Sequence, residues 1–339
     1  MKKLFIISNE SIYSEKNKYF CDNIDLKTLP EGLNKNFQVN LIGRKSKINR
    51  AFNIDLKDIK IYENIFSFLS QIIKSAKDIN SKYLIISISP YTFLACIFLK
   101  IFGKTPIIYL RSDGYGEYKS ILGFIGPIIY HIMFSISSSI SSLISCRKYI
   151  LKGKKGNIVT PSQLDNDWFQ NRKQNSYSET KLLYVGRIRK EKGIFSLISL
   201  IKDKSNIYLT IVGEEKEFSH KINQKNVFIK KNENNKMNLI KFYDDHNIFI
   251  LPSFTEGHPM VLLEALARSR PVIIFDEIKH VIGNKKGIFI ASRNFESLSK
   301  TINEIKENYQ SIQEEMKQNN LPKHKEFIGQ MEDIVSKVN

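Results

Sequence analysis

The stretch that decides the fold is residues 249–276, FILPSFTEGHPMVLLEALARSRPVIIFD. It contains two short runs of Ile, Leu, Val and Phe, separated by a polar loop and a segment with helical apolar spacing. Strands without polar alternation are buried on both faces, as in parallel sheets covered by helices. The stretch therefore predicts a strand, a helix and a second strand of a parallel sheet.

The same alternation of short apolar runs and helical segments extends along the whole chain. Further expected strands are residues 3–8, 37–42, 83–89, 106–110, 181–185 and 207–212, with 248–251 and 271–275 flanking the helix above. Such a βα alternation is typical of a doubly wound α/β fold.

The length of 339 residues exceeds that of one hydrophobic core, so two domains are expected. A polar segment, residues 152–178, interrupts the alternation, which restarts at residue 181. We expect one domain over residues 1–160 and a second over residues 161–322. The final helix, about residues 323–339, is expected to pack back on the first domain.

The composition, 42% apolar and 25% charged, is that of a globular protein, and the net charge of +18 favours anionic partners. Nucleic acid, phosphorylated small molecules and an acidic membrane face all remain open, as does a solvated basic surface. Residues 1–180 hold 26 Lys and Arg against 14 Asp and Glu, a surplus of 12. The three cysteines share no metal or disulfide spacing, and the N-terminal apolar run is short for a signal peptide, which predicts a reduced, cytoplasmic protein.

Residues 120–146 form the longest uncharged stretch. They are long enough to span a bilayer, but glycines, a proline and many serines make them a poor span. Three alternatives stay open: a buried helix followed by a strand, a helix that docks on a membrane surface, and a transmembrane helix.

Residues 182–193, LLYVGRIRKEKG, place Gly186 at a strand end, followed by Arg187 and Lys192. Ligands of open α/β sheets bind at the carboxyl ends of the strands, and cations beside backbone N–H groups at a helix start suit a diphosphate. The alternative is a basic surface loop.

Glu256 and Glu264 are unusually placed. Pro259 is expected at the first helical position, which puts Glu256 in the loop at the helix entrance. Glu264 lies within an apolar run, where an ionised carboxylate is costly without hydrogen-bond partners, and ribose hydroxyls would supply them. The alternative for Glu264 is an exposed pair with Arg268 one turn later.

Glu-x7-Glu after a strand, with GR-x4-KG about seventy residues upstream, resembles the retaining glycosyltransferases of family 4. The resemblance covers most of residues 181–292 and implies the GT-B fold, two Rossmann-like domains facing a cleft. It implies that residues 1–160 form the acceptor-side domain and residues 161–322 the nucleotide-sugar-binding domain. It implies that Arg187 and Lys192 hold the donor pyrophosphate, that Glu256 contacts the transferred sugar and that Glu264 binds the ribose. It also implies a nest of backbone amides around the sugar and phosphate at Gly257, His258 and Pro259, and we expect Gly186, at the strand end, to contact the donor as well.

The chain departs from this family in three places. The first strand runs on as FIISNESIYSEKN, without a Gly-Gly loop, and the usual acceptor-side His is replaced by the segment that contains Arg111 and Asp113. These two residues are our candidates for acceptor binding. Ser269-Arg270 replaces the Gly that usually precedes Pro-Val, which we expect to affect only a turn.

The expected enzyme is therefore a hexosyltransferase that moves a sugar from a nucleotide sugar to a lipid-linked or glycan acceptor in surface polysaccharide or lipopolysaccharide assembly. We expect peripheral contact with the inner membrane face, no nucleic acid partner, no cofactor and no metal. Asp165 and Asp167 form an Asp-x-Asp triplet, which we interpret as turn formers rather than metal ligands. A nucleotide-sugar epimerase of the same shape and a basic nucleic-acid-binding protein are the alternatives.

Overall fold

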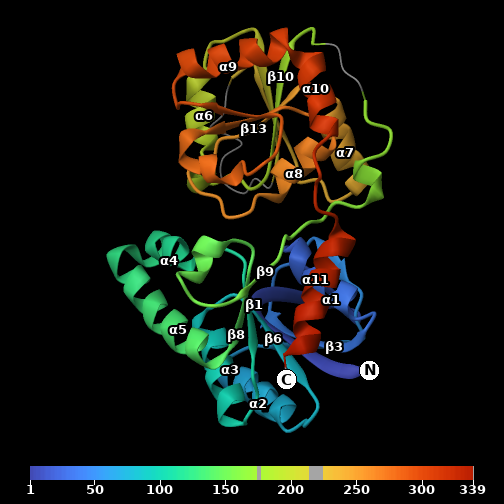
Figure 1. Cartoon of the computed structure of the whole chain (residues 1–339), viewed down its shortest axis with the longest axis vertical. Coiled ribbons are helices and arrows are strands. Elements are labelled where there is room, and N and C mark those ends of the chain that lie inside the picture. The colour runs from blue at the N-terminus through green and yellow to red at the C-terminus, as the bar shows by residue number, and fades with distance from the viewer. Residues whose placement is uncertain (174–176, 214–223, 339) are drawn as a thin grey trace. The chain divides into compact units, whose positions relative to one another are not determined.

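The computed structural model describes residues 1–173, 177–213 and 224–338. Residues 174–176 of the polar segment between the predicted domains lie outside this range. The chain forms two compact units, Met1–Pro161 with Lys325–Asn339, and Ser162–His324. In each unit a sheet lies between helices (Figure 1). Both sheets are largely parallel, so the predicted α/β class with two parallel-sheet domains is confirmed.

Unit 1 is built on a parallel sheet in the order β5-β3-β1-β6-β7-β8-β9. An antiparallel ribbon, β1-β2-β4, extends from the far part of β1. The strands are β1 (Lys2–Glu15), β2 (Lys18–Cys21), β3 (Phe37–Lys45), β4 (Phe52–Ile54), β5 (Asp58–Tyr62), β6 (Lys82–Ile86), β7 (Ile107–Leu110), β8 (Ser142–Ser145) and β9 (Asn157–Ile158).

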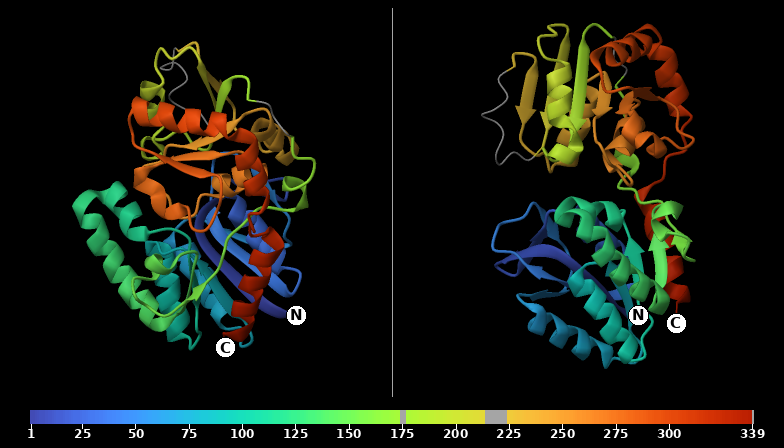
Figure 2. Two further views of the ribbon diagram at one scale, coloured as in Figure 1. Left: turned by 45° about the horizontal axis from the view of Figure 1, so that its top comes forward. Right: turned by 90° about the vertical axis from the view of Figure 1, so that its left-hand side faces the viewer.

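Helices cover both faces of this sheet. They are α1 (Ile24–Leu33), α2 (Ile65–Ala76), α3 (Pro90–Ile101), α4 (Gly114–Leu122), α5 (Gly126–Ile140) and α11 (His324–Lys337), with short 3-10 turns η1 (Gly123–Ile125) and η2 (Lys148–Leu151). Side chains of α2, α3 and α5 form one core, and those of α1 and α11 form the other. Figures 1 and 2 show α11, the red helix, beside the blue N-terminal elements, where Phe327 and Met331 are buried.

Unit 2 has a six-stranded, fully parallel sheet in the order β12-β11-β10-β13-β14-β15. Its strands are β10 (Thr180–Val185), β11 (Ile207–Val212), β12 (Val227–Lys230), β13 (Ile248–Leu251), β14 (Val272–Phe275) and β15 (Ile288–Ala291). Its helices are α6 (Ile194–Leu200), α7 (Lys236–Asp244), α8 (Met260–Ala267), α9 (Phe295–Glu307) and α10 (Tyr309–Lys317), with 3-10 turns η3 (Asn166–Trp168), η4 (Lys190–Lys192) and η6 (Asp276–Val281). All four residues of β13 and of β14 are buried, as expected for central strands.

Residues 120–146 form two helices and a strand rather than one span. Among the helices that the structure describes, only the run over residues 114–140 is long and apolar enough to cross a membrane. Its most apolar window is 28% buried, so most of that window is exposed. Gly123 (φ 64°) breaks the run between α4 and α5. A Cβ at Gly126 would lie 1.9 Å from the Tyr118 carbonyl oxygen, so the two helices fold against each other. The run is divided into helices of nine and fifteen residues, each shorter than the ~20 residues of a straight span, and both membrane alternatives stay predictions. The alternative of a buried helix followed by a strand is partly confirmed. The strand is present as β8, and α5 is buried on one face only.

Candidate active site

The predicted diphosphate loop lies at the carboxyl end of β10. Gly186 (φ 147°) and Gly193 (φ 67°) have backbone angles that favour glycine, and a Cβ at Gly193 would lie 1.9 Å from the Pro252 carbonyl oxygen. Close contact between the ends of β10 and β13 therefore requires glycine. The side chain of Arg187 is exposed, and the structure gives it no partner among the described residues. Its guanidinium is available to an anion.

Lys192 and Glu256 are brought together from loops that follow β10 and β13. The Lys192 Nζ atom lies 2.6 Å from Glu256 Oε1, and Ser253 Oγ donates to the same oxygen at 2.7 Å. The side chains of Lys192 and Glu256 are 21% and 10% exposed, so the pair is largely screened from water. His280 Nε2 lies 2.7 Å from the Glu256 carbonyl oxygen and ties this loop to η6. Sequence reasoning predicted that these residues share a site; it did not predict that they pair with each other.

Helix α8 begins one residue later than expected. Pro259 is the N-cap in an extended conformation (φ −73°, ψ 111°), and Met260 is the first helical residue. Pro259 is buried, whereas Gly257 and His258 are half-buried in the loop before it. Pro259 has no side-chain group that can cap the helix, so the first N–H groups of α8 are left without a side-chain cap. These N–H groups lie at the start of a helix of eight residues, in the loop region of Glu256, and suit an anion.

Glu264 already has a partner within the protein. The Tyr243 hydroxyl, on α7, donates to Glu264 Oε2 at 2.7 Å. Burial raises the pKa of Glu264 to about 7, against the lowering effect of the Tyr243 hydrogen bond. The alternative pair with Arg268 is wrong, because the Arg268 guanidinium binds Asp244 at 2.7 Å instead.

Ser269 and Arg270 do more than change a turn. Ser269 has a left-handed backbone (φ 53°), the conformation for which glycine is usual. Arg270 is 1% exposed and lies 3.4 Å from Asp244, which also binds the equally buried Arg268. Arg268 and Arg270 also donate to carbonyl oxygens of Trp168, Gln170, Asn171 and Lys173. The expectation of a local effect was wrong, because the side chain of Arg270 anchors the segment that enters unit 2.

Arg293 is a site residue that sequence reasoning missed. It follows β15, donates to the Pro252 carbonyl oxygen at 3.0 Å and to Glu277 at 2.7 Å, and stacks 4.1 Å above the ring of Phe254. It thereby fixes the loop between β13 and Glu256. The signal was present as a short apolar run, IFIA, directly before Ser292 and Arg293, but this run is a partly buried edge strand that was not recognised as a strand.

In unit 1, Arg111 and Asp113 follow β7 and are both engaged within the unit. Arg111 forms an ion pair with Asp25 at 3.0 Å. Asp113 caps α4 through the Tyr115 amide and lies 3.4 Å from the Lys152 amine. Both lie at the carboxyl edge of the sheet, and their acceptor-binding role stays a prediction. In place of a Gly-Gly loop, β1 continues to Glu15 and pairs with β2.

The Asp-x-Asp triplet forms a turn. Asp165 caps the short 3-10 turn by accepting from the Asp167 amide at 3.1 Å, and Lys236 forms ion pairs with both carboxylates. Within the described ranges no group of three His, Cys, Asp or Glu side chains is arranged to hold a metal ion. Metal independence remains a prediction to be tested.

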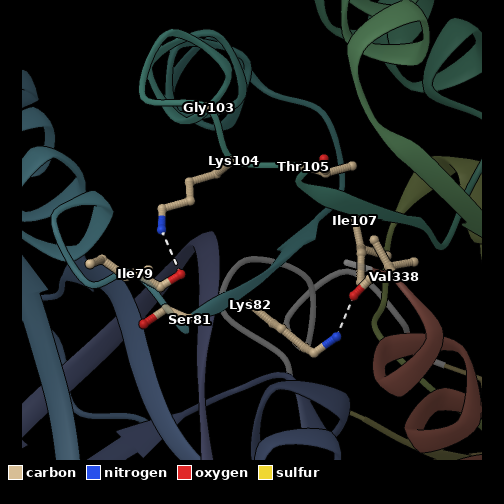
Figure 3. A pocket seen from close by; sticks show the side chains of 8 residues that line it. All are labelled: Ile79, Ser81, Lys82, Gly103, Lys104, Thr105, Ile107 and Val338. Carbon is tan, nitrogen blue, oxygen red and sulfur yellow. Dashed lines mark hydrogen bonds between the residues drawn. The ribbon is translucent and has the colours of Figure 1, made fainter.

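A pocket in unit 1 lies at the opposite end of the sheet from the predicted ligand edge (Figure 3). Lys82 and Ile107, the first residues of β6 and β7, line it together with Val338. The Lys82 amine donates to the Ser336 carbonyl oxygen at 3.1 Å and to that of Val338, and Lys104 donates to the Ile79 carbonyl oxygen. The two Lys82 contacts hold the end of α11 on the sheet, so the pocket is part of helix docking.

Comparison with known proteins decides the family. Residues 166–333 match the family described as Glycosyl transferases group 1, and this range contains every site residue of unit 2 described above. The chain is a group 1 glycosyltransferase. It transfers a sugar from a nucleotide sugar, and the expected absence of a nucleic acid partner stays a prediction. No curated protein sequence matches it.

Solved structures resemble the glycosyltransferase over its whole length. Sucrose-phosphate synthase from Thermosynechococcus elongatus has a TM-score of 0.69 at 14% identity, over 99% of both chains. HepE from Anabaena, solved with UDP-glucose, has a TM-score of 0.68 at 10% identity, over 99% of both chains. WaaG, a glycosyltransferase involved in lipopolysaccharide biosynthesis, has a TM-score of 0.67 at 13% identity, over 98% of this chain and 100% of its own. These likenesses confirm the GT-B fold.

Proposed function

We propose that the glycosyltransferase transfers a hexose, with retention of configuration, from a nucleoside diphosphate to a lipid-linked or glycan acceptor in cell-surface polysaccharide assembly. The observation that supports this most directly is the contact between Lys192 and Glu256 at the carboxyl ends of β10 and β13, with exposed Arg187 in the same loop as Lys192. Two cations beside a helix start suit a diphosphate, and an adjoining carboxylate suits sugar hydroxyls.

The cations account for leaving-group stabilisation. When the bond between the anomeric carbon and the phosphate oxygen breaks, negative charge develops on the diphosphate. Arg187 is exposed and Lys192 is positioned by Glu256, so both can meet that charge with little reorganisation. In this account neither a metal ion nor a cofactor is needed for the step.

Retention follows from attack on the face that the diphosphate leaves. The acceptor oxygen forms the new bond to the anomeric carbon, and its proton passes to a departing phosphate oxygen. A double displacement would instead need a carboxylate nucleophile. Glu256 Oε1 already accepts from both Lys192 and Ser253, which lowers its nucleophilicity and favours front-face attack.

The donor clamp is testable by calorimetry with UDP, the nucleotide of the donor seen in HepE. Arg187→Ala and Lys192→Ala should each weaken UDP binding by about 1 to 3 kcal/mol, as expected for loss of a charge-assisted hydrogen bond. The exposed Lys190→Ala, in the same loop, is the matched control and should leave affinity unchanged. GDP and ADP titrated in parallel would reveal a different base preference. Equal nucleotide affinity in the wild type and in both clamp variants would contradict the proposal.

A further inference from the structure

The face of the α4-α5 hairpin that points away from unit 1 is apolar and uncovered. Its exposed large side chains include six that are each at least 41% exposed: Ile121, Phe124, Ile125, Ile128, Ile132 and Ile136. We call these six residues the hairpin face. Phe124, in the turn between the helices, is 83% exposed. Figures 1 and 2 show the hairpin at the edge of unit 1 remote from α11.

These side chains are not needed to hold the hairpin together. The buried side of α5 packs through Tyr130, Met133 and Phe134. The ring of Tyr130 lies against those of Tyr115 and Tyr118 of α4. A helix that is apolar all round but buried on only one face exposes its other apolar face, which is typical of a site that binds a membrane or another apolar surface.

Cations lie on the segment that packs against the start of α4 in the hairpin, and they favour an anionic partner. Residues 114–146 contain one acidic and one basic side chain, Glu117 and Lys119, whereas residues 147–155 contain five Lys and Arg. This basic segment packs against the hairpin, because Lys152 Nζ lies 5.2 Å from the centre of the Tyr115 ring, and the Tyr115 hydroxyl lies 2.9 Å from His131 Nδ1 on α5. Lys148, Lys154 and Lys155 are exposed.

We infer that the hairpin face docks the glycosyltransferase on an anionic membrane surface, with Phe124 and the Ile side chains in the interface and the cations near lipid headgroups. Apolar side chains bordered by lysines are the features of a monotopic membrane contact. Association of two copies through the same face would bring two sets of lysines together, which is unfavourable. The docking itself needs no donor chemistry; its use in reaching a membrane-borne acceptor rests on the proposed function.

The test is co-sedimentation of the full chain with vesicles of phosphatidylcholine containing phosphatidylglycerol, and with vesicles of phosphatidylcholine alone. The wild type should bind the anionic vesicles, and high salt should release it. Phe124→Ser with Ile128→Ser should lower vesicle affinity at least about tenfold, because two large apolar side chains leave the interface. Lys154→Gln with Lys155→Gln should also lower it at least about tenfold, since each lysine near an anionic surface contributes about fivefold.

The matched control is Phe66→Ser with Ile79→Ser, two equally exposed apolar side chains on α2 and the loop after it, at 81% and 87% exposure. This control should bind vesicles like the wild type. The inference would be overturned if the wild type did not bind vesicles, if high salt did not release it, or if the hairpin variant bound as well as the wild type. It would also be overturned if the wild type bound no vesicles but formed a dimer that the hairpin substitutions dissociate. Calorimetry with UDP on every variant keeps this result separate from the donor site, where no change is expected.

Discussion

Replacing Glu256 with glutamine should lower kcat about 100- to 1,000-fold and should leave UDP affinity unchanged or raise it. This loss of kcat is the range found when one preorganised polar group is removed from a reacting centre. Glu256 is assigned to the transferred sugar, so its loss should affect turnover. It is also the counter-ion of Lys192, at 2.6 Å. Glutamine leaves Lys192 without that ion pair and free to bind phosphate.

Steady-state kinetics with UDP-glucose and calorimetry with UDP separate these two effects. Glu191→Gln is the matched control, because Glu191 belongs to the same site loop but is 47% exposed and lies 3.8 Å from Arg189. It should change kcat little. Full activity in Glu256→Gln, or a loss of UDP affinity in proportion to the loss of kcat, would refute the role given to Glu256.

Glu264→Gln should stabilise the fold at pH 8 and weaken nucleotide binding. Burial raises the pKa of Glu264 from 4.5 to about 7, and a rise of that size corresponds to about 3 kcal/mol. A carboxyl whose pKa is higher in the folded state destabilises that state progressively as pH rises from about 4.5 to about 7, and constantly above that. Glutamine has no such cost and can still accept the Tyr243 hydrogen bond.

Denaturant unfolding at pH 5 and pH 8 measures this effect. The free energy of unfolding of Glu264→Gln should exceed that of the wild type by up to about 3 kcal/mol at pH 8 and by much less at pH 5. Exposed Glu307→Gln should match the wild type at both pH values. UDP affinity of the wild type should rise between pH 6 and pH 8, because ionised Glu264 is the better acceptor for ribose hydroxyls. A pH-independent difference in stability would contradict the assigned pKa.

The buried apolar strands could be predicted from sequence because burial on both faces leaves a continuous hydrophobic run. All eight expected strands are present. Strands β12 and β15 were missed because they are the edge strands of the sheet in unit 2 and are only partly buried, unlike the equally short β13 and β14. The strands β2, β4, β5 and β9 of unit 1 were not predicted either. Strand β1 was predicted to end near Ser8 but continues to Glu15. Its last residues pair with β2 in an antiparallel ribbon, and such a partly exposed ribbon does not require a continuous apolar run.

The candidate site could be located from spacing, but its internal pairing could not. Two motifs at the ends of parallel strands must meet at one sheet edge, and Lys192 and Glu256 do so. That Tyr243 bonds Glu264, or that Arg293 supports the Glu256 loop, depends on side chains from elements far apart in sequence. Arg270 was misjudged because a charged residue in a turn position is usually exposed, whereas here Asp244 supplies a buried partner.

The most direct test of the central claim is the anomeric configuration of the first product formed from UDP-glucose, followed by NMR in the presence of EDTA. Lipid-linked and glycan acceptors are offered in parallel, and omission of acceptor controls for hydrolysis. The account predicts that UDP release requires acceptor, persists in EDTA, and yields a glycoside with the α configuration of the donor. An inverted β-glycoside, or transfer that EDTA abolishes and Mn²⁺ restores, would contradict it.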